Sequence, residues 1–397
     1  MKILFVGQHY WPENFKTTEI CESLVAMGHQ VEALVGLPNY PTGDIPKEYR
    51  LCRNRKQYRN GVYINRCFEI GRKPGKVGLA INYVSYMISA TLKIIFKKRD
   101  YDVIYAYSTS PVLMSFPAAV ASKFFGKKLV IHVLDIWPAC LAAMQVKESS
   151  KLYRIMTKVS KWIYSQADIL LYGSKGFQQY LLNTHGIKVS DEQYLPQFAD
   201  SLFENSIPTT KTNKEQFNFV FAGNIGKMQA VEVIIKAAAL TKDAPITWHI
   251  IGDGSHLDTC KSLAKTLNVE KNVVFYGQKP VEDMPKYYSM ADAMLLTLVN
   301  DILVNDTLPA KVQGYMAQQK PILCCAAGES EYVITKAKCG LTAKVEDEKE
   351  LAKIALEFIK LPPEEIKRMS NNAKEYYTLN FPKALHMKRL EYFLNKQ

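Results

Sequence analysis

Residues 306–321 read DTLPAKVQGYMAQQKP, and this stretch separates two apolar runs at 293–297 and 322–325. Proline suits the first turn of a helix, where its missing N–H costs nothing, so the stretch predicts a helix that starts at Pro309. Lys320-Pro321 ends that helix, and the apolar run after it predicts a buried strand. Strand, helix and strand in this order form the repeating unit of a parallel sheet.

The start of this helix carries groups that suit an anionic ligand. Asp306 lies just before it, and Lys311 lies in its first turn, where a cation opposes the helix dipole. An anion at the helix start would explain that lysine, because the free amides would face the anion too. A carboxylate, an amide-rich helix start and a lysine suit a sugar linked to a diphosphate. An ordinary strand-to-helix turn with a lysine placed by chance is the alternative.

The same alternation extends over the whole chain. Short apolar runs predict strands at 3–6, 30–35, 102–106, 128–134 and 169–172, and again at 219–222, 247–251, 273–276, 293–297 and 322–325. Helical patterns lie between them, among them 18–27 and 231–240. The segment from Pro196 to about 216 is polar and interrupted by prolines, which is typical of a linker. We therefore predict an α/β protein with two Rossmann-like parallel-sheet domains, 1–200 and 201–380, and a C-terminal segment 381–397 that contains a helix at 383–395.

Charge and cysteine content restrict the possible partners. The 397 residues carry a formal net charge of +13, and residues 1–200 hold +11 of it from 26 basic and 15 acidic side chains. This asymmetry suggests a membrane surface, a nucleic acid or a phosphorylated acceptor as partner of the first half. A nucleic acid is disfavoured, because the basic stretch lacks interleaved stacking aromatic residues. The eight cysteines form no C-x-x-C pair, and the N-terminal apolar run is too short for a signal peptide, so we expect a cytoplasmic protein with reduced thiols.

Ligands of open parallel sheets bind where the strands end. Gly223-Asn224-Ile225-Gly226 lies at such an end, and its glycines would let backbone amides approach a phosphate, although a plain tight turn fits as well. The first strand is followed by GQHYWP rather than by G-x-G-x-x-G, and no P-loop motif occurs. Both observations argue against a nicotinamide enzyme and a P-loop ATPase.

Some other polar residues near the strands are candidates for chemistry and others are not. Asp135 follows the strand at 128–134 and is placed to face a ligand, with a structural cap as the alternative. His132, inside that strand, is interpreted as a core histidine. Asp100-Tyr101-Asp102 matches a D-x-D metal motif but falls at the opposite edge of the sheet, so we interpret it as surface structure. We find no cluster of His, Cys and carboxylate residues and predict no metal site.

Residues 77–96 have the length of a membrane-spanning helix but are amphipathic. Apolar residues at 77, 81, 84, 88, 92 and 95 share one helical face, beside a polar stripe of Asn82, Ser85, Ser89 and Lys93. Basic residues flank both ends: Arg72, Lys73, Lys76, Lys97, Lys98 and Arg99. Packing against the sheet is the first interpretation and lying in an anionic membrane interface is the second. Spanning is the least favoured, because the polar stripe would meet lipid.

Taken together, the motifs resemble the retaining GT-B glycosyltransferases of family four over nearly the whole chain, in the branch for bacterial capsule, O-antigen and exopolysaccharide assembly. The matching residues are His9-Tyr10-Trp11-Pro12-Glu13, Gly28-His29-Gln30-Val31, Pro38-Asn39-Tyr40-Pro41 with Gly43, Asp135-Ile136-Trp137-Pro138, Gly223-Asn224-Ile225-Gly226 with Gln229, Gly252-Asp253-Gly254, and Pro309-x-Lys311 with Tyr315-Met316-Ala317.

The resemblance implies a GT-B fold, with two domains facing a central cleft and the C-terminal helix packed back on the N-terminal domain. It implies a hexosyl or N-acetylhexosaminyl transfer from a nucleotide-sugar, expected to be a UDP-sugar, to a lipid-linked or polysaccharide acceptor. The expected place is the cytoplasmic face of the membrane. No metal and no cofactor beyond the donor substrate are expected.

Roles for individual residues follow from the same resemblance. Asp306 matches the first acid of the family's E-x7-E signature, expected near the donor sugar, and Lys311 is expected at the diphosphate; with Asp135 they are the candidate catalytic residues. The candidate donor-binding residues are Gly223, Asn224, Gly226, Lys227, Gly252, Asp253, Gly277, Pro309 and Gln313. The candidate acceptor-side residues are His9, Tyr10, Asn39 and Tyr40.

The chain departs from the family pattern at three places. The second signature acid, usually a ribose ligand, falls at Gly314. The usual Arg and Lys of the first donor loop fall near Asn224 and Gln229, and the histidine that often precedes Asp135 falls at Leu134. Lys227 and Gln313 are candidates to compensate. Two alternatives therefore stay open: a catalytically silent GT-B subunit that binds a partner transferase, and a nucleotide-sugar 2-epimerase on the same fold.

Overall fold

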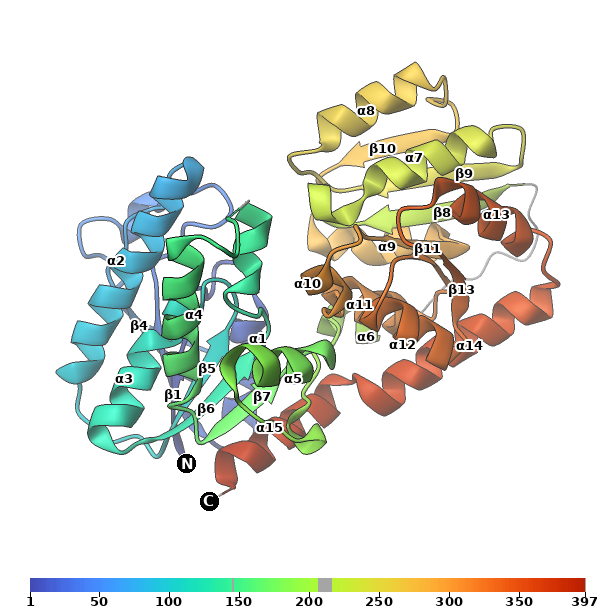
Figure 1. Cartoon of the computed structure of the whole chain (residues 1–397). Coiled ribbons are helices and arrows are strands. Elements are labelled where there is room, and N and C mark those ends of the chain that lie inside the picture. The colour runs from blue at the N-terminus through green and yellow to red at the C-terminus, as the bar shows by residue number, and fades with distance from the viewer. Residues whose placement is uncertain (145, 206–215, 397) are drawn as a thin grey trace. The chain divides into compact units, whose positions relative to one another are not determined.

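The computed structural model describes residues 1–144, 146–205 and 216–396, which form two compact units (Figure 1). The first unit comprises Met1–Leu195 and the residues from Met387 onward, and the second comprises Pro196–His386. The predicted linker at 196–216 lies partly outside the described residues, and its described part contains α6, Ser201–Asn205. The chain returns to the first unit within α15, Lys383–Asn395.

Seven strands of the described chain form the sheet of the first unit, in the order β3-β4-β2-β1-β5-β6-β7. β3 pairs antiparallel with β4, and the other neighbours are parallel. All residues of β5 are buried, because helices cover both faces of the sheet. The bounds are β1 Lys2–Val6, β2 Gln30–Val35, β3 Lys56–Arg59, β4 Val62–Arg66, β5 Val103–Ser108, β6 Lys128–Val133 and β7 Ile169–Tyr172.

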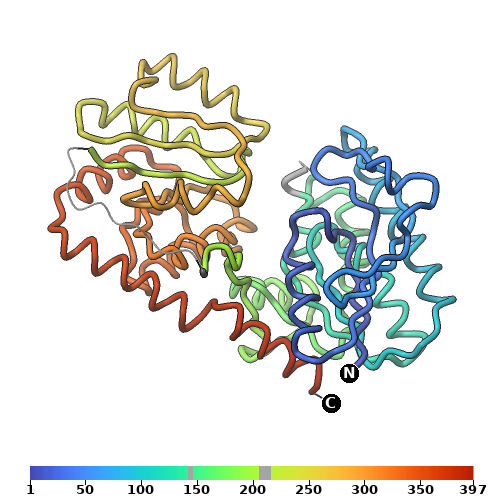
Figure 2. The backbone as a smooth tube through the Cα atoms, turned by 180° about the vertical axis from the view of Figure 1, so that it is seen from behind, coloured from blue at the N-terminus to red at the C-terminus, as the bar shows by residue number. Residues whose placement is uncertain are grey.

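Helices pack on both faces of this sheet. α2 (Gly75–Ile95), α3 (Phe116–Phe125) and α4 (Lys151–Tyr164) lie on one face, and α1 (Lys16–Ala26) lies on the other, as the two opposite views show (Figures 1 and 2). α15 also packs on this unit: Glu391 lies 3.0 Å from His29 Nε2, and Lys128 Nζ donates to Leu394 O at 2.8 Å. Shorter helical segments are α5 Gly176–Tyr180, η1 Lys47–Tyr49, η2 Val112–Ser115, η3 Ala139–Met144, η4 Leu181–His185 and η5 Asp191–Gln193.

The second unit contains a parallel sheet of six described strands, in the order β10-β9-β8-β11-β12-β13. Two cores flank it, one around Phe219, Trp248 and Phe358, the other around Tyr288, Tyr315 and Met316. The strands are β8 Phe217–Ala222, β9 Ile246–Ile251, β10 Val273–Gly277, β11 Ala293–Thr297, β12 Ile322–Cys325 and β13 Gly340–Ala343. The helices are α7 Val231–Leu240, α8 Leu257–Thr266, α9 Met284–Met290, α10 Ile302–Asn305, α11 Ala310–Ala317, α12 Glu329–Ala337, α13 Glu348–Phe358 and α14 Pro363–Asn380, with η6 Lys227–Gln229 and η7 Val281–Asp283.

The helix predicted to start at Pro309 is α11, and it begins one residue later. Pro309 has φ −65° and ψ 135°, so it is the extended N-cap residue rather than the first helical residue. The fixed φ of proline suits both positions, and the extended ψ of Pro309 makes it the N-cap residue here.

Candidate functional site

Three loops of the second unit come together where β8, β9 and β10 end. Gly223 N donates to Ile251 O, and Gly252 N donates to Gly277 O, each at 3.0 Å. A Cβ on Gly252 would overlap Gly223 O, so only glycine allows the first two loops to approach this closely. The loops therefore form a layer of exposed backbone at the carboxyl ends of the strands, where a parallel sheet binds its ligand.

The first turn of α11 lies against the first of these loops. Tyr315 OH donates to Ala222 O at 3.1 Å and ties the helix to the end of β8. No described side chain caps the helix at Pro309, so its first amides are left for another partner. A Cβ on Gly223 would lie 3.1 Å from Lys311 Nζ, which shows how closely the lysine approaches the loop. The helix start, the lysine and the glycine loop thus lie next to one another.

Lys311 sits among neutral groups. Its Nζ donates to Gln229 Oε1 at 2.6 Å and lies 4.2 Å from the centroid of the Phe221 ring. Burial lowers the pKa of Lys311 to about 7, since water is excluded from the charged form and the groups named here are uncharged. A bound diphosphate would supply the missing negative charge.

The remaining predicted donor residues differ in how open they are. Asn224, Lys227 and Asp253 are exposed, and Asp253 Oδ1 accepts a hydrogen bond from Gly254 N at 2.7 Å. Asp306 is partly buried at the end of α10, where burial raises the pKa of its carboxyl. Within the described ranges its carboxylate accepts no hydrogen bond, so it is available to a ligand.

The Gln313 side chain is turned toward its own helix. It is buried, and its amide nitrogen donates to Pro309 O at 2.9 Å and to Ala310 O at 3.1 Å. These bonds use the amide within the helix. The expected role of Gln313 in donor binding stays a prediction, and it requires the amide to leave these bonds.

Gly314 faces two aromatic rings. A Cβ at this position would lie 3.5 Å from Phe203 Cδ2 and 3.9 Å from Tyr288 Cε2. The rings of Phe203 and Tyr288 stack on each other, with centroids 4.9 Å apart and planes at 4°. Position 314, where the family has its second signature acid, therefore lies beside two aromatic rings. The sequence did not predict this contact, because Phe203 is more than a hundred residues away.

Asp135 is held rigidly at the carboxyl end of β6 in the first unit. Its Oδ2 accepts from Ser110 N at 2.8 Å, and Trp137 Nε1 donates to Ser110 Oγ at 3.1 Å. Burial raises the pKa of Asp135, and the bonds from Ser110 oppose that rise. His132 is fully buried between Tyr105 OH and Leu195 O, which confirms its interpretation as a core histidine.

Glu13 organises the loops beside β1 and β2. Its Oε2 lies 2.9 Å from His9 Nδ1, and its Oε1 accepts from the backbone N–H groups of Asn39 and Tyr40, each at 2.7 Å. His9 stacks on Phe15 at 4.5 Å, and Tyr40 is exposed beside them. Sequence reasoning did not assign Glu13 a role, although its spacing of four from His9 was a usable signal.

Three of the four predicted acceptor-side residues are buried: His9, Tyr10 and Asn39. Tyr10 lies in the core beside Phe5, and its hydroxyl is buried too. The Asn39 side chain donates to Leu37 O at 2.8 Å and to Glu69. The side chains of Tyr10 and Asn39 thus shape the loops, and Tyr40 is the exposed residue of the four. The acceptor-side assignment stays a prediction.

A buried acid ties that loop cluster to α2. Glu69 is fully buried, and Gln8 Nε2 donates to it at 3.1 Å and to Asn82 Oδ1 at 2.9 Å. Burial raises the pKa of Glu69 well above its usual range, with the charge of Glu13 adding to the effect. Glu69 is thus a structural carboxylic acid, not one offered to a substrate.

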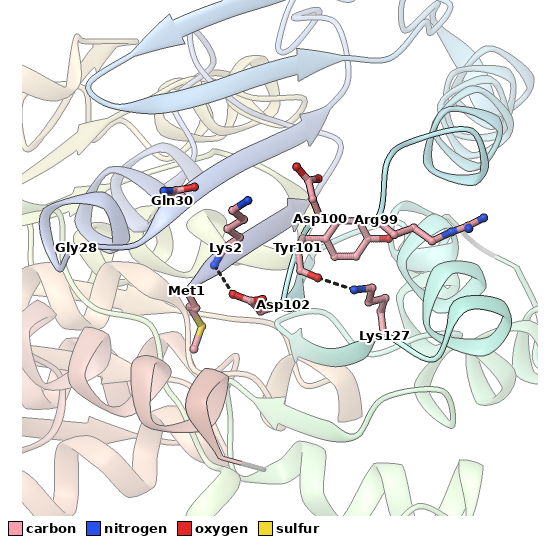
Figure 3. A pocket seen from close by; sticks show the side chains of 9 residues that line it. All are labelled: Met1, Lys2, Gly28, Gln30, Arg99, Asp100, Tyr101, Asp102 and Lys127. Atoms are coloured by element: carbon pink, nitrogen blue, oxygen red, sulfur yellow. Dashed lines mark hydrogen bonds between the residues drawn. The ribbon is translucent and has the colours of Figure 1, made fainter.

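A hollow of about 470 Å³ lies at the other edge of the first sheet, around Asp100-Tyr101-Asp102 (Figure 3). Asp102 Oδ2 accepts from Lys2 N at 2.7 Å, and Lys127 Nζ donates to Tyr101 O at 2.8 Å (Figure 3). These acids lie where β1 and β5 begin, whereas Asp135 lies where β6 ends. The D-x-D sequence is surface structure, as predicted. Among the described residues no three His, Cys, Asp or Glu side chains group in a way that could hold a metal ion.

Two protein-family models match the chain: Glycosyl transferase 4-like domain over residues 15–196, and Glycosyl transferases group 1 over residues 203–376. The chain belongs to the group 1, GT4-like glycosyltransferases. This is a retaining, metal-independent family with the GT-B fold, so the fold implied by the sequence motifs is confirmed. Lys311, Asp306 and the glycine loops lie in the segment that the group 1 model matches.

Relatives in sequence and structure agree with this assignment. The probable glycosyltransferase WbjE of Pseudomonas aeruginosa is 26% identical over 297 residues, which is 72% of each chain. The putative colanic acid biosynthesis glycosyl transferase WcaI of Escherichia coli K12 is 20% identical over 335 residues, or 80% of this chain and 81% of WcaI. Anabaena HepE in complex with UDP has a TM-score of 0.71 at 16% identity over 100% of both chains, and its complex with UDP-glucose has 0.69 at 17%, again over 100% of both. At such identities the structural likeness shows the fold alone.

Proposed function

We propose that this glycosyltransferase moves a hexosyl or N-acetylhexosaminyl group from a UDP-sugar to a lipid-linked or polysaccharide acceptor in cell-surface glycan assembly. The observation that carries the proposal is Lys311, which lies beside the glycine loops at an uncapped helix start and whose partners in the described part of the chain, Gln229 and Phe221, are neutral. The HepE complexes support UDP as the first nucleotide to test. The colanic acid relative supports a glycan product.

The chemistry rests on stabilising the leaving group. As the bond between sugar and diphosphate breaks, negative charge develops on the diphosphate. In this proposal Lys311 and the first amides of α11 offset that charge. In this proposal Asp306 orients hydroxyls of the donor sugar, and Asp135 meets the acceptor hydroxyl.

Calorimetry with UDP tests the donor site. Lys311→Ala should weaken UDP binding by about 1–3 kcal/mol, the scale of a charge-assisted hydrogen bond. Lys336→Ala is the matched control, because Lys336 is an exposed lysine of α12 in the same unit and its removal changes the net charge equally. Unchanged affinity in Lys311→Ala would remove Lys311 from the site. Tighter binding of GDP or dTDP than of UDP would leave the site in place and overturn the choice of nucleotide.

A catalytically silent subunit is the second candidate function, and Gly314 favours it. The position carries no carboxylate and faces Phe203 and Tyr288. The purified chain alone, supplied with UDP-sugars and a lipid extract as acceptor, distinguishes the two functions. Donor-dependent product supports the transferase. If the chain binds UDP but product forms only after a second protein is added, the silent subunit is supported.

A further inference from the structure

The outer face of α2 is apolar and exposed. Of the described residues, α2 forms the one helix that is long and apolar enough to cross a membrane by length and composition. Its buried face consists of Asn82, Tyr86, Ala90 and Ile94. Five of the six residues of the predicted apolar face point to solvent, between 39% and 73% exposed, and the sixth, Ile95, is partly exposed. Phe96, just after the helix, is 85% exposed and continues this face. The exposed residues are Val77, Ile81, Val84, Ile88, Leu92 and Phe96. These six residues are called the apolar stripe below. The helix does pack on the sheet, as the first interpretation expects, but the side that packs is the one that carries Asn82 and Tyr86, and the apolar face points outward.

The polar stripe of α2 is what attaches the helix to the protein. Asn82 Nδ2 donates to Ile70 O at 2.7 Å, and Ser85 Oγ accepts from Ile70 N at 3.0 Å. Lys93 Nζ donates to Arg66 O at 2.8 Å. Spanning a bilayer would break these bonds and leave their partners without replacement in lipid. The helix is therefore fixed with its polar side inward and its apolar side outward.

Cations stand at both ends of the apolar stripe. Lys73 and Lys76 are exposed where α2 begins, and Lys98 and Arg99 are exposed just after it ends. The first half of the stripe also borders a shallow apolar hollow of about 520 Å³, lined by Val77, Ala80, Ile81, Val84 and Ile88 with Lys76 and Ser85. An apolar strip bounded by cations matches the layers of an anionic bilayer, in which hydrocarbon lies beneath negatively charged headgroups.

We propose that α2 docks on an anionic lipid bilayer, lying along its surface with the apolar stripe inserted among the headgroups and the four flanking cations at lipid phosphates. This surface adjoins the acceptor-side loop. Gly43 is in close contact with Arg72 O, and the Arg72 guanidinium lies 5.8 Å from the centroid of the Tyr40 ring. A lipid-linked acceptor would thus be presented next to that loop, while docking itself does not depend on the transfer reaction.

Flotation of the full chain with vesicles tests the docking. Binding is expected to vesicles that contain phosphatidylglycerol, to fall as salt rises, and to be weak on phosphatidylcholine alone. Ile81→Ser combined with Ile88→Ser should lower the bound fraction by about tenfold. The reason is that the inserted apolar area determines the part of the binding that salt does not weaken. Leu240→Ser combined with Leu379→Ser is the matched control, since both leucines are similarly exposed but belong to the second unit. Changing Lys73, Lys76, Lys98 and Arg99 to Gln should remove most of the salt-dependent binding. Circular dichroism and the Tm of every variant check that it is folded.

Insertion is tested separately with brominated lipids. Ile88→Trp should gain a fluorescence signal that brominated lipids quench, and Leu379→Trp should not. The proposal is overturned if anionic vesicles do not bind the chain, if the two-serine stripe variant floats as the wild type does, or if only detergent releases the chain from native membranes. It is also overturned if the stripe mediates a dimer in ultracentrifugation and no vesicle binding is found.

Discussion

At the scale of single residues, Lys311 is expected to set how the proposed donor site responds to pH. Its neighbours Gln229 and Phe221 are neutral, and burial lowers the pKa of Lys311 to about 7. In the ligand-free protein the amine therefore loses its proton as pH rises through about 7. A bound diphosphate favours the protonated form and raises that pKa. Binding of UDP above pH 7 must then take up a proton.

UDP affinity is accordingly expected to fall as pH rises from about 7 to 8.5, and proton uptake on binding is expected to grow over the same range. Calorimetry in two buffers of different ionisation enthalpy measures both quantities. Lys311→Arg is the control, because a guanidinium stays charged throughout this range and should abolish the uptake. Equal uptake in the wild type and Lys311→Arg would show that another group titrates.

The two candidate carboxylates are expected to act on turnover rather than on folding. Asn at position 135 keeps an oxygen for Ser110 N, and the Asp306 carboxylate has no hydrogen bond to lose in the described structure. Asp135→Asn and Asp306→Asn should each keep a Tm near that of the wild type and lower kcat/KM about tenfold or more. Asp258→Asn, on the exposed side of α8, is the control for a lost surface charge. Full turnover in either variant would disprove its role, and a collapse of Tm would show that the residue is structural.

At the scale of elements, α11 combines a binding end with an unusual interior glycine. Glycine inside a helix costs about 0.5–1 kcal/mol relative to alanine. Natural helices keep such a glycine where a larger side chain would collide with a neighbour. In α11 that neighbour is the stacked pair of Phe203 and Tyr288, which leaves room for a methyl group but lies across the path of a longer side chain.

Gly314→Ala should therefore raise the free energy of unfolding by about 0.5–1 kcal/mol and leave UDP affinity unchanged. Gly314→Glu should lower the free energy of unfolding, since the carboxylate would be buried against two aromatic rings without a partner. Denaturant titration of both variants measures the changes. If Gly314→Glu is as stable as the wild type and binds UDP more tightly, the aromatic pair does not occupy the place of the signature acid.

At the scale of the whole molecule, the two units should respond differently to UDP. The groups proposed to bind UDP all belong to the second unit, so UDP should slow hydrogen exchange in the loops after β8 and β9 and in the first turn of α11. The sheet of the first unit should exchange as before. A ligand at a hundred times its Kd stabilises the folded state by about 2.7 kcal/mol, so Tm should rise as well. Lys311→Ala should reduce both effects. Protection confined to residues 1–195 would show that the nucleotide binds to the first unit and would contradict the proposal.

Most strands could be predicted because their signal is local. A buried parallel strand is a short apolar run, and the runs at 30–35, 169–172, 293–297 and 322–325 match β2, β7, β11 and β12 residue for residue. β3 and β4 were not predicted, since the edge strand KQYR is mostly polar and VYINR, beside it, ends in two polar residues. β13 was missed too, because GLTA is short and only partly buried.

Sequence alone determined the α/β class, the tandem arrangement, the family resemblance and the helix start with Asp306 and Lys311. Each of these depends on residues near one another in the chain, or on motifs in a fixed order. Only the tertiary structure decided that Tyr10, Asn39 and Gln313 turn inward, that Glu13 holds two loops, and that Gln229 is the partner of Lys311. It also decided that the apolar face of α2 is the outer one. The physical reason is that burial and hydrogen-bond partners depend on what packs against a side chain, and here those partners are brought together from elements far apart in the sequence.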